Sequence, residues 1–210
     1  MKKILIVLIL FLRASYALAH PHAFIDMYTV PKVENQQLIG FSMRWRLDEA
    51  SSSAVLYDLA LAKGNNEEEQ KLVDDIMQNI VNEHYFSYFF DKNNNKIKYK
   101  RQPENYGMKE IGSQVEYYFD LLLAKPQPLR KTKLTLKTYD SSYYVAMVYP
   151  ESTMQAIDFS SLPAHCQGKI IDPNVDDKIR RYASSLDKNQ RNEDDSLGRI
   201  FAQELQIKCE

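Results

Sequence analysis

Two histidines stand one residue apart near the start of the chain, in His20-Pro21-His22. In an extended segment both imidazoles lie on the same side, because side chains alternate along a strand. Pro21 has no amide proton, so the square-planar chelate of a peptide with histidine in third position cannot form. The imidazoles, with the α-amine of His20 if it is freed, suit zinc, copper or nickel together with ligands from the fold. A solvated N-terminus without metal is the alternative interpretation.

Carboxylates at the ends of predicted strands are the candidates for the remaining ligands. Asp48 and Glu49 lie where a predicted strand gives way to a helix, and Asp140 lies in a turn between two strands. Two imidazoles with one or two carboxylates make an ordinary zinc site. A structural interpretation competes with this one, because Asp48 could cap the helix and Asp140 could shape the turn. The candidate metal ligands are therefore His20, His22, Asp48, Glu49 and Asp140.

Residues 1–19 have the pattern of a cleavable secretory signal peptide. Two lysines precede an uncharged apolar run over residues 4–12, which is shorter than the roughly 20 apolar residues that span a bilayer. Small residues follow, so we predict cleavage after Ala19, with Ala17 as a second site; an uncleaved membrane anchor is the alternative. The mature protein is then a single domain over residues 20–210. We expect it in the periplasm of a Gram-negative bacterium, without any inserted membrane segment.

The charge balance bears on the kind of partner. The whole chain has a formal net charge of -1, and removal of the signal peptide takes away two lysines and one arginine. A mildly acidic mature protein is not expected to bind nucleic acid, which favours a clustered basic face. The basic stretch over residues 96–101 alternates with apolar residues and is typical of the solvated face of a strand.

The chain has two cysteines, Cys166 and Cys209. An even number of cysteines in an exported protein predicts a disulfide. This bridge would tie the C-terminal end back to the domain across a long loop, which the loop-entropy model values at roughly 3–4 kcal/mol. Two thiolate metal ligands are the alternative.

The hydrophobic pattern predicts an α+β fold, with a mostly antiparallel, sandwich-like sheet. Its first hairpin is followed by a helical insertion, and a short helix over residues 197–205 lies near the C-terminus. Proline-containing residues 126–128 are expected to turn the chain between two strands, and residues 184–196 to form a loop. Strands are predicted over residues 23–33, 38–47, 85–90, 96–101, 114–123, 131–139, 143–149 and 154–159, and the inserted helices over 49–62 and 67–85.

Signatures of catalysis are absent from the sequence. It contains no Gly-x-Ser-x-Gly, no glycine-rich phosphate loop and no His-Glu-x-x-His. We therefore do not expect an enzyme. His84 and His165 are interpreted as helix-end or core residues, and Trp45, the single tryptophan, as a core residue.

Several blocks of the sequence resemble a known family of periplasmic proteins. These blocks are His20-Pro21-His22-Ala23-Phe24-Ile25-Asp26, Trp45-Arg46-Leu47-Asp48-Glu49, Tyr85-Phe86-Ser87-Tyr88, Tyr139-Asp140-Ser141-Ser142-Tyr143-Tyr144-Val145 and the paired cysteines. The family was catalogued as a domain of unknown function, and its members are labelled the periplasmic component of an uncharacterised ABC-type transport system. The resemblance covers nearly the whole mature chain. Phe24 and Ser141 depart from the family, which often has tryptophan and proline there.

The resemblance implies a partner as well as a compartment. Members of the family tend to be encoded beside NicO-class nickel/cobalt-type membrane transporters, and one such pair, the Zev system, is associated with zinc acquisition. The leading hypothesis is a periplasmic protein that binds a divalent transition metal, zinc first, with nickel, cobalt or copper as alternatives, and assists a transporter of the inner membrane. A docking adaptor that binds no metal is the second hypothesis. A copper enzyme using the N-terminal histidine and its amine is the third.

Overall fold

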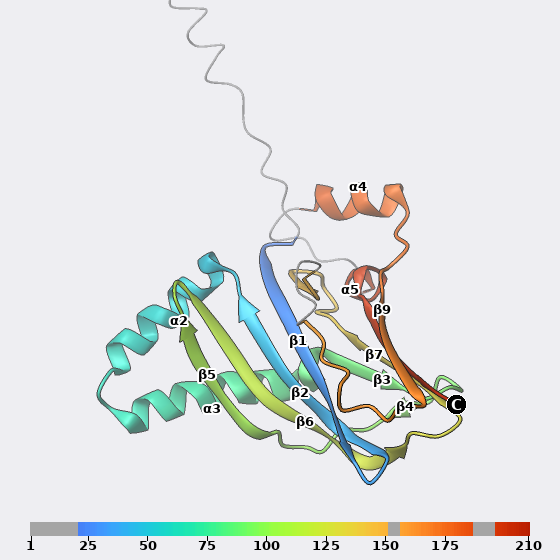
Figure 1. Cartoon of the computed structure of the whole chain (residues 1–210). Coiled ribbons are helices and arrows are strands. Elements are labelled where there is room, and N and C mark those ends of the chain that lie inside the picture. Colours follow the sequence, from blue (N-terminus) through green and yellow to red (C-terminus); the bar gives the residue numbers. More distant parts are fainter. Residues whose placement is uncertain (1–20, 151–155, 187–195) are drawn as a thin grey trace, which may run out of the picture.

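The computed structural model describes residues 21–150, 156–186 and 196–210, and Figure 1 shows their arrangement. Within these residues the chain forms two five-stranded sheets and four helices. Most neighbouring strands run antiparallel. The α+β class, the helices after the first hairpin and the short helix near the C-terminus are confirmed.

The first sheet contains β1 (Ala23–Glu34), β2 (Gln37–Leu47), β5 (Glu104–Ile111), β6 (Gln114–Pro128) and β8 (Val145–Val148). Their order across the sheet is β5-β6-β2-β1-β8. β1 and β2 form the predicted hairpin, with Met27 opposite Trp45. β8 pairs with β1 in parallel, with Val145 opposite Ala23. The start of β1 is therefore held between β2 and β8.

The second sheet contains β3 (Ser87–Phe90), β4 (Lys96–Ile97), β7 (Thr132–Thr138), β9 (Cys166–Ile171) and β10 (Glu204–Cys209). Its strand order is β4-β3-β7-β10-β9, so β10 lies between two earlier strands of the chain. The sequence pattern did not predict β5, β9 or β10. The predicted strand over residues 96–101 is reduced to the two residues of β4.

One hydrophobic core joins the two sheets. Phe41, Met43 and Trp45 alternate along β2, and each is at most 1% exposed. The ring of Phe41 meets the ring of Phe89 on β3 edge to face, with centroids 5.2 Å apart. Aromatic pairs prefer this geometry, and the contact packs β2 of the first sheet against β3 of the second. The prediction that Trp45 belongs to the core is confirmed.

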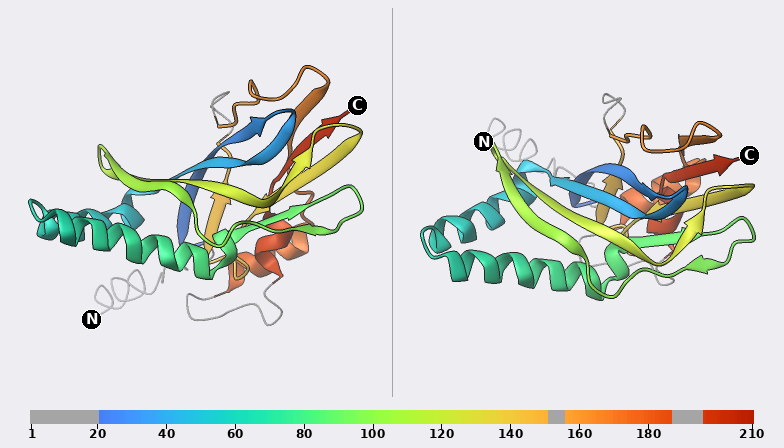
Figure 2. Two further views of the ribbon diagram at one scale, coloured as in Figure 1. Left: turned by 90° about the horizontal axis from the view of Figure 1, so that it is seen from below. Right: turned by 60° about the horizontal axis from the view of Figure 1, so that its bottom comes forward.

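The helical insertion consists of α2 (Glu49–Ala62) and α3 (Asn66–Asn82). Asp48 caps α2, because its side chain accepts a hydrogen bond from the Ser51 backbone. The side chain of Asn65 caps α3 in the same way. Figure 2 shows the two helices lying side by side and extending outward beyond the first sheet. The capping interpretation of Asp48 is thus correct.

A left-handed turn follows α3 where the sequence predicts continued helix to residue 85. Its three residues form η1 (His84–Phe86), with φ values of 52°, 57° and 47°. Bulky residues seldom adopt positive φ. The hydroxyl of Tyr85 donates to the backbone carbonyls of Lys100 and Arg101, at 3.4 and 3.2 Å, which helps to hold the turn. The turn redirects the chain from the helix into β3.

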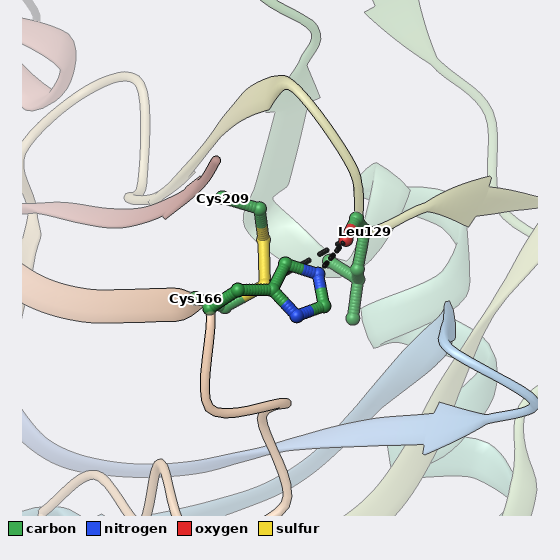
Figure 3. Close-up of a disulfide and its surroundings, with 4 residues drawn as sticks. Leu129, Cys166 and Cys209 are labelled. Carbon is green, nitrogen blue, oxygen red and sulfur yellow. Dashed lines mark hydrogen bonds between the residues drawn. A yellow bond between two sulfur atoms is a disulfide. The ribbon is translucent and has the colours of Figure 1, made fainter.

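The disulfide joins Cys166 of β9 to Cys209 of β10, with an S–S distance of 1.98 Å (Figure 3). The two cysteines are opposite one another in the antiparallel register. The predicted bridge is therefore present, and the alternative of two thiolate ligands is wrong because both sulfur atoms are used. Leu129 lies beside the bridge, and its carbonyl accepts a 2.6 Å hydrogen bond from Nε2 of His165.

Two further expectations are corrected. The predicted turn at residues 126–128 is part of β6, which pairs there with Gln37 and Leu38 of β2. The proline nitrogens are tolerated because β5 pairs with β6 only as far as Asp120, which leaves one edge of this extension without a β5 partner. The predicted helix over residues 197–205 ends early, as α5 (Leu197–Phe201), and the chain then enters β10.

Part of the predicted pattern lies outside the described residues, namely positions 151–155 and 187–195. The expected strand at 154–159 is represented by Ile157, which forms an isolated bridge with Thr29. The first two residues of the loop expected at 184–196 belong instead to α4 (Asp177–Ser185). None of the described helices is long and apolar enough to cross a membrane.

Candidate functional site

His22 lies immediately before β1, on the exposed surface. Its backbone N–H donates to the carbonyl of Tyr144 at 2.8 Å, and the two rings are 4.8 Å apart between centroids. The parallel pairing of β1 with β8 thus brings the histidine segment beside the Tyr139–Val145 segment, although more than a hundred residues separate them in sequence. His20 lies outside the described residues.

Asp48 connects the end of β2 to the start of β1. Its Oδ2 accepts a 2.7 Å hydrogen bond from the backbone N–H of Phe24, and its own N–H donates to the carbonyl of Phe24 at 3.0 Å. Ser51 donates to the same carboxylate through its backbone, at 2.7 Å, and through its hydroxyl, at 2.9 Å. Partial burial disfavours the charged form, but these hydrogen bonds outweigh it and lower the pKa of Asp48.

Asp140 holds the loop that leads into β8. Its Oδ1 accepts from the backbone of Ser142 at 3.1 Å, and its Oδ2 accepts from the Ser142 hydroxyl at 2.8 Å and from the backbone of Val145 at 3.0 Å. Gly198 of α5 packs against this loop so closely that a Cβ there would lie 1.7 Å from the Asp140 carbonyl oxygen. The turn-shaping interpretation of Asp140 is therefore correct.

Glu49 takes a different direction from Asp48. It is exposed, and its Oε1 accepts a 2.7 Å hydrogen bond from the hydroxyl of Ser113, in the turn between β5 and β6. Asp48 faces β1, on the opposite side of β2 from β6. The structure thus brings His22, Asp48 and Asp140 to one end of β1, and places Glu49 toward the other edge of the first sheet.

The donor set at this end of β1 fits a metal ion only in part. Among the described residues, no group of three or more histidine, cysteine, aspartate or glutamate side chains is arranged to hold one. Asp48 and Asp140 each use both carboxylate oxygens to accept backbone or hydroxyl hydrogens. The described residues therefore supply one exposed imidazole and two carboxylates that position the backbone around it.

The two remaining histidines lie elsewhere. His84 follows α3 and is exposed within the left-handed turn, so it is a helix-end residue rather than a core residue. His165 is exposed at the disulfide, on the second sheet, where its ring bonds the carbonyl of Leu129.

Sequence reasoning missed an apolar cavity of about 200 Å³ beneath this corner of the fold. Trp45 lines it, together with Ile80 of α3 and Met147 of β8, and Asp140 and Glu83 also contribute. The indole Nε1 of Trp45 is buried and has no hydrogen-bond partner among the residues that the structure describes. No sequence pattern indicates the cavity, because it forms only where α3, the left-handed turn and β8 meet in the fold.

Comparison with known proteins places the chain in a family. Residues 5–209 match the family described as "Protein of unknown function (DUF1007)", and the chain belongs to it. An uncharacterized protein of Haemophilus influenzae (strain ATCC 51907 / DSM 11121 / KW20 / Rd) is similar, with 61% identity over 193 residues that cover 92% of each chain. No solved structure matches.

Proposed function

We propose that this protein is a periplasmic metal-binding accessory of a transition-metal transporter in the inner membrane. The signal peptide would be removed after Ala19, and His20 and His22 would hold the metal, zinc first, with nickel, cobalt or copper as alternatives. The transporter would be of the NicO class. The family resemblance to transport-associated periplasmic proteins, including the Zev zinc system, supports the partner and the compartment.

The position of His22 is the observation that carries the proposal. The imidazole is exposed at the corner of a rigid sheet, against the ring of Tyr144. Asp48 fixes the backbone at Phe24, and Asp140 fixes it at Val145, opposite Ala23. A ligand on a well-fixed backbone loses little conformational entropy when it binds a metal ion. The main role proposed for Asp48 and Asp140 is to orient the histidine segment. They would coordinate the metal ion only through lone pairs that no hydrogen bond already uses.

Calorimetry of the processed protein tests the proposal. The periplasmic protein is purified, its N-terminus is identified by mass spectrometry, and Zn²⁺ is titrated into the wild type and into a His20→Ala/His22→Ala variant. We expect the variant to lose at least tenfold in affinity, because two of the ligands are removed. A His84→Ala/His165→Ala variant is the matched control and should bind as the wild type does. Equal affinity in all three proteins would contradict the assignment of the site.

A docking adaptor that binds no metal is the second candidate. It is favoured by the hydrogen bonds that already occupy the oxygens of Asp48 and Asp140. The two candidates differ in one experiment. If the His20→Ala/His22→Ala variant is recovered with the transporter in the normal amount and supports normal zinc uptake, the adaptor is correct; loss of uptake with retained docking supports the metal-binding protein.

A further inference from the structure

A groove of about 1020 Å³ lies on the face of the second sheet that points away from the core. Tyr88 and Phe90 of β3, with Thr135 and Lys137 of β7, form its floor. The turn between β3 and β4 borders it on one side, and residues 172–174 with α5 border it on the other. In Figure 1 this sheet and α5 lie on the opposite side of the molecule from the helical insertion.

Basic side chains outnumber carboxylates along the groove. The basic residues are Lys92, Lys96, Lys133, Lys137 and Arg199, and the acidic residues are Asp91, Asp172 and Glu204. This surplus belongs to a protein whose overall formal charge is -1, so it is a local feature of the surface. A cleft with a surplus of one sign of charge attracts ligands of the opposite sign.

All three carboxylates already have partners. Asp91 accepts from the backbones of Asn93 and Asn95, at 2.9 and 2.8 Å, and closes the β3–β4 turn. Asp172 accepts from Gln203 at 2.7 Å, and Glu204 pairs with Lys137 at 2.7 Å. Asp91 and Asp172 are held in place by neutral donors and keep their negative charges, so the groove retains a surplus of basic over acidic side chains without being free of carboxylates.

The other four basic side chains of the groove, unlike Lys137, have no carboxylate partner within the described residues. Lys92, Lys96, Lys133 and Arg199 make no ion pair with any residue in the described parts of the chain, and all four side chains are exposed. They come from three separate places, the β3–β4 hairpin, β7 and α5. This distribution suits several anionic groups spaced along a ligand better than one compact anion, which would require cations that converge on a point.

Apolar surface lies between these cations. The rings of Tyr88 and Tyr139 stack with centroids 4.5 Å apart and planes 20° apart, and Phe90, Ile171 and Ile200 line the same groove. Burial raises the pKa of both Tyr88 and Tyr139, so their hydroxyls stay neutral and add no negative charge. Aromatic faces of this kind pack well against aliphatic side chains.

We propose that this groove binds an extended acidic segment of a partner protein, with apolar side chains between its carboxylates. The carboxylates of the segment would pair with Lys92, Lys96, Lys133 and Arg199. Its apolar side chains would pack against the stacked rings of Tyr88 and Tyr139. A polyphosphate satisfies the cations but leaves the apolar floor uncovered, which is why a peptide suits the groove better. The groove lies on the second sheet and the histidine segment on the first, so this inference does not rest on the metal-binding proposal.

A fluorescently labelled peptide of alternating glutamate and leucine tests the inference, with anisotropy as the measurement. We expect saturable binding that weakens as salt is raised, because the cations are exposed and screened. Unlabelled hexaglutamate and tripolyphosphate are the competitors, and both should compete more weakly than the unlabelled alternating peptide. If either competes equally well, apolar side chains contribute nothing to binding. The groove is then a simple anion site, and the proposal of an acidic segment with apolar side chains is overturned.

Charge reversal locates the binding. Lys133→Glu combined with Arg199→Glu should weaken the peptide by about tenfold or more, because like charges then face the ligand. Lys63→Glu combined with Lys125→Glu is the matched control, since these lysines are exposed and do not line the groove. Both variants should keep the circular dichroism and melting temperature of the wild type. Equal loss in the two variants, or no binding by the wild type, would overturn the proposal.

Discussion

Asp48 and Phe24 are joined by two hydrogen bonds in opposite directions, from the Phe24 N–H to the Asp48 carboxylate and from the Asp48 N–H to the Phe24 carbonyl. The same carboxylate caps α2 through Ser51. One side chain therefore couples the first turn of the inserted helix to the first residues of β1. Because His22 lies two residues before Phe24, the position of the candidate ligand depends on this contact.

Replacing Asp48 with alanine should lower the free energy of unfolding by about 2–3 kcal/mol, since it removes a helix cap and a charge-assisted hydrogen bond to Phe24. Denaturation with urea measures the change. Asp176→Ala is the matched control, because Asp176 caps α4 through Lys178 and, within the described residues, its side chain bonds no strand. It should lose only about 1 kcal/mol. Similar losses in the two variants would mean that the Phe24 contact adds nothing to stability.

Stability should fall as the solution is acidified below about pH 4, the ordinary range of an aspartate. The fold lowers the pKa of both Asp48 and Asp120. At Asp120 burial alone would raise the pKa, but hydrogen bonds from Lys32 and Asn105 outweigh this effect. A lowered pKa contributes stability that is complete above the unfolded-state pKa and is lost as pH falls through the folded-state value. Urea denaturation from pH 7 to pH 2 measures this loss. Asp120→Asn should reduce the slope, and an unchanged slope in that variant would contradict the assignment.

Removing the disulfide should cost about 4 kcal/mol, because in the loop-entropy model the bridge closes a long loop. The cysteines are 43 residues apart in sequence. A Cys166→Ala/Cys209→Ala variant and the reduced wild type should unfold at the same, lower denaturant concentration. The reductant should leave the variant unaffected. A reductant effect that persists in the variant would point to another cause.

Gly198→Ala should destabilise the protein by about 3 kcal/mol or more, since the added methyl group meets the Asp140 carbonyl oxygen, which belongs to the backbone and has little room to move. Gly112→Ala is a contrasting variant, because that glycine has a φ of +62° and open space around it. Its cost should be only about 1 kcal/mol, from backbone strain alone. Thermal unfolding compares the two, and the reverse order would show that the Asp140 loop yields easily.

Patterns among neighbouring residues predicted those elements whose formation depends mainly on interactions between residues close in sequence. The hydrophobic pattern along residues 38–47 predicted β2, and the capping interpretation of Asp48 marked the start of α2. The cysteine count predicted the disulfide. The first two features depend on side chains close in sequence, and the third follows from there being only two cysteines to pair.

Features that depend on distant contacts were missed or misplaced. β5 contains Asn105 and Gly107, which weaken its alternation, and it exists because β6 offers an edge to pair with. Residues 126–128 extend β6 because β2 pairs with them on one side. The left-handed turn at η1 involves no glycine or asparagine, and tertiary contacts such as those of Tyr85 hold it in place. At the candidate site the sequence grouped His22, Asp48, Glu49 and Asp140, and the structure brings all of these except Glu49 to one end of β1. The capping of α2 by Asp48 and the shaping of the turn by Asp140, the alternative interpretations from sequence, are both present.

The place of β10 in the middle of the second sheet has a consequence for the order of folding. β10 follows every other described strand along the chain, yet it fills the gap between β7 and β9. Until it arrives, both of those strands keep an open edge, and open edges invite pairing with other chains. β3, β4 and β7 can pair earlier, whereas the sheet closes and the cysteines come into register only when β10 inserts. Slow synthesis of the C-terminal segment would therefore prolong an aggregation-prone intermediate.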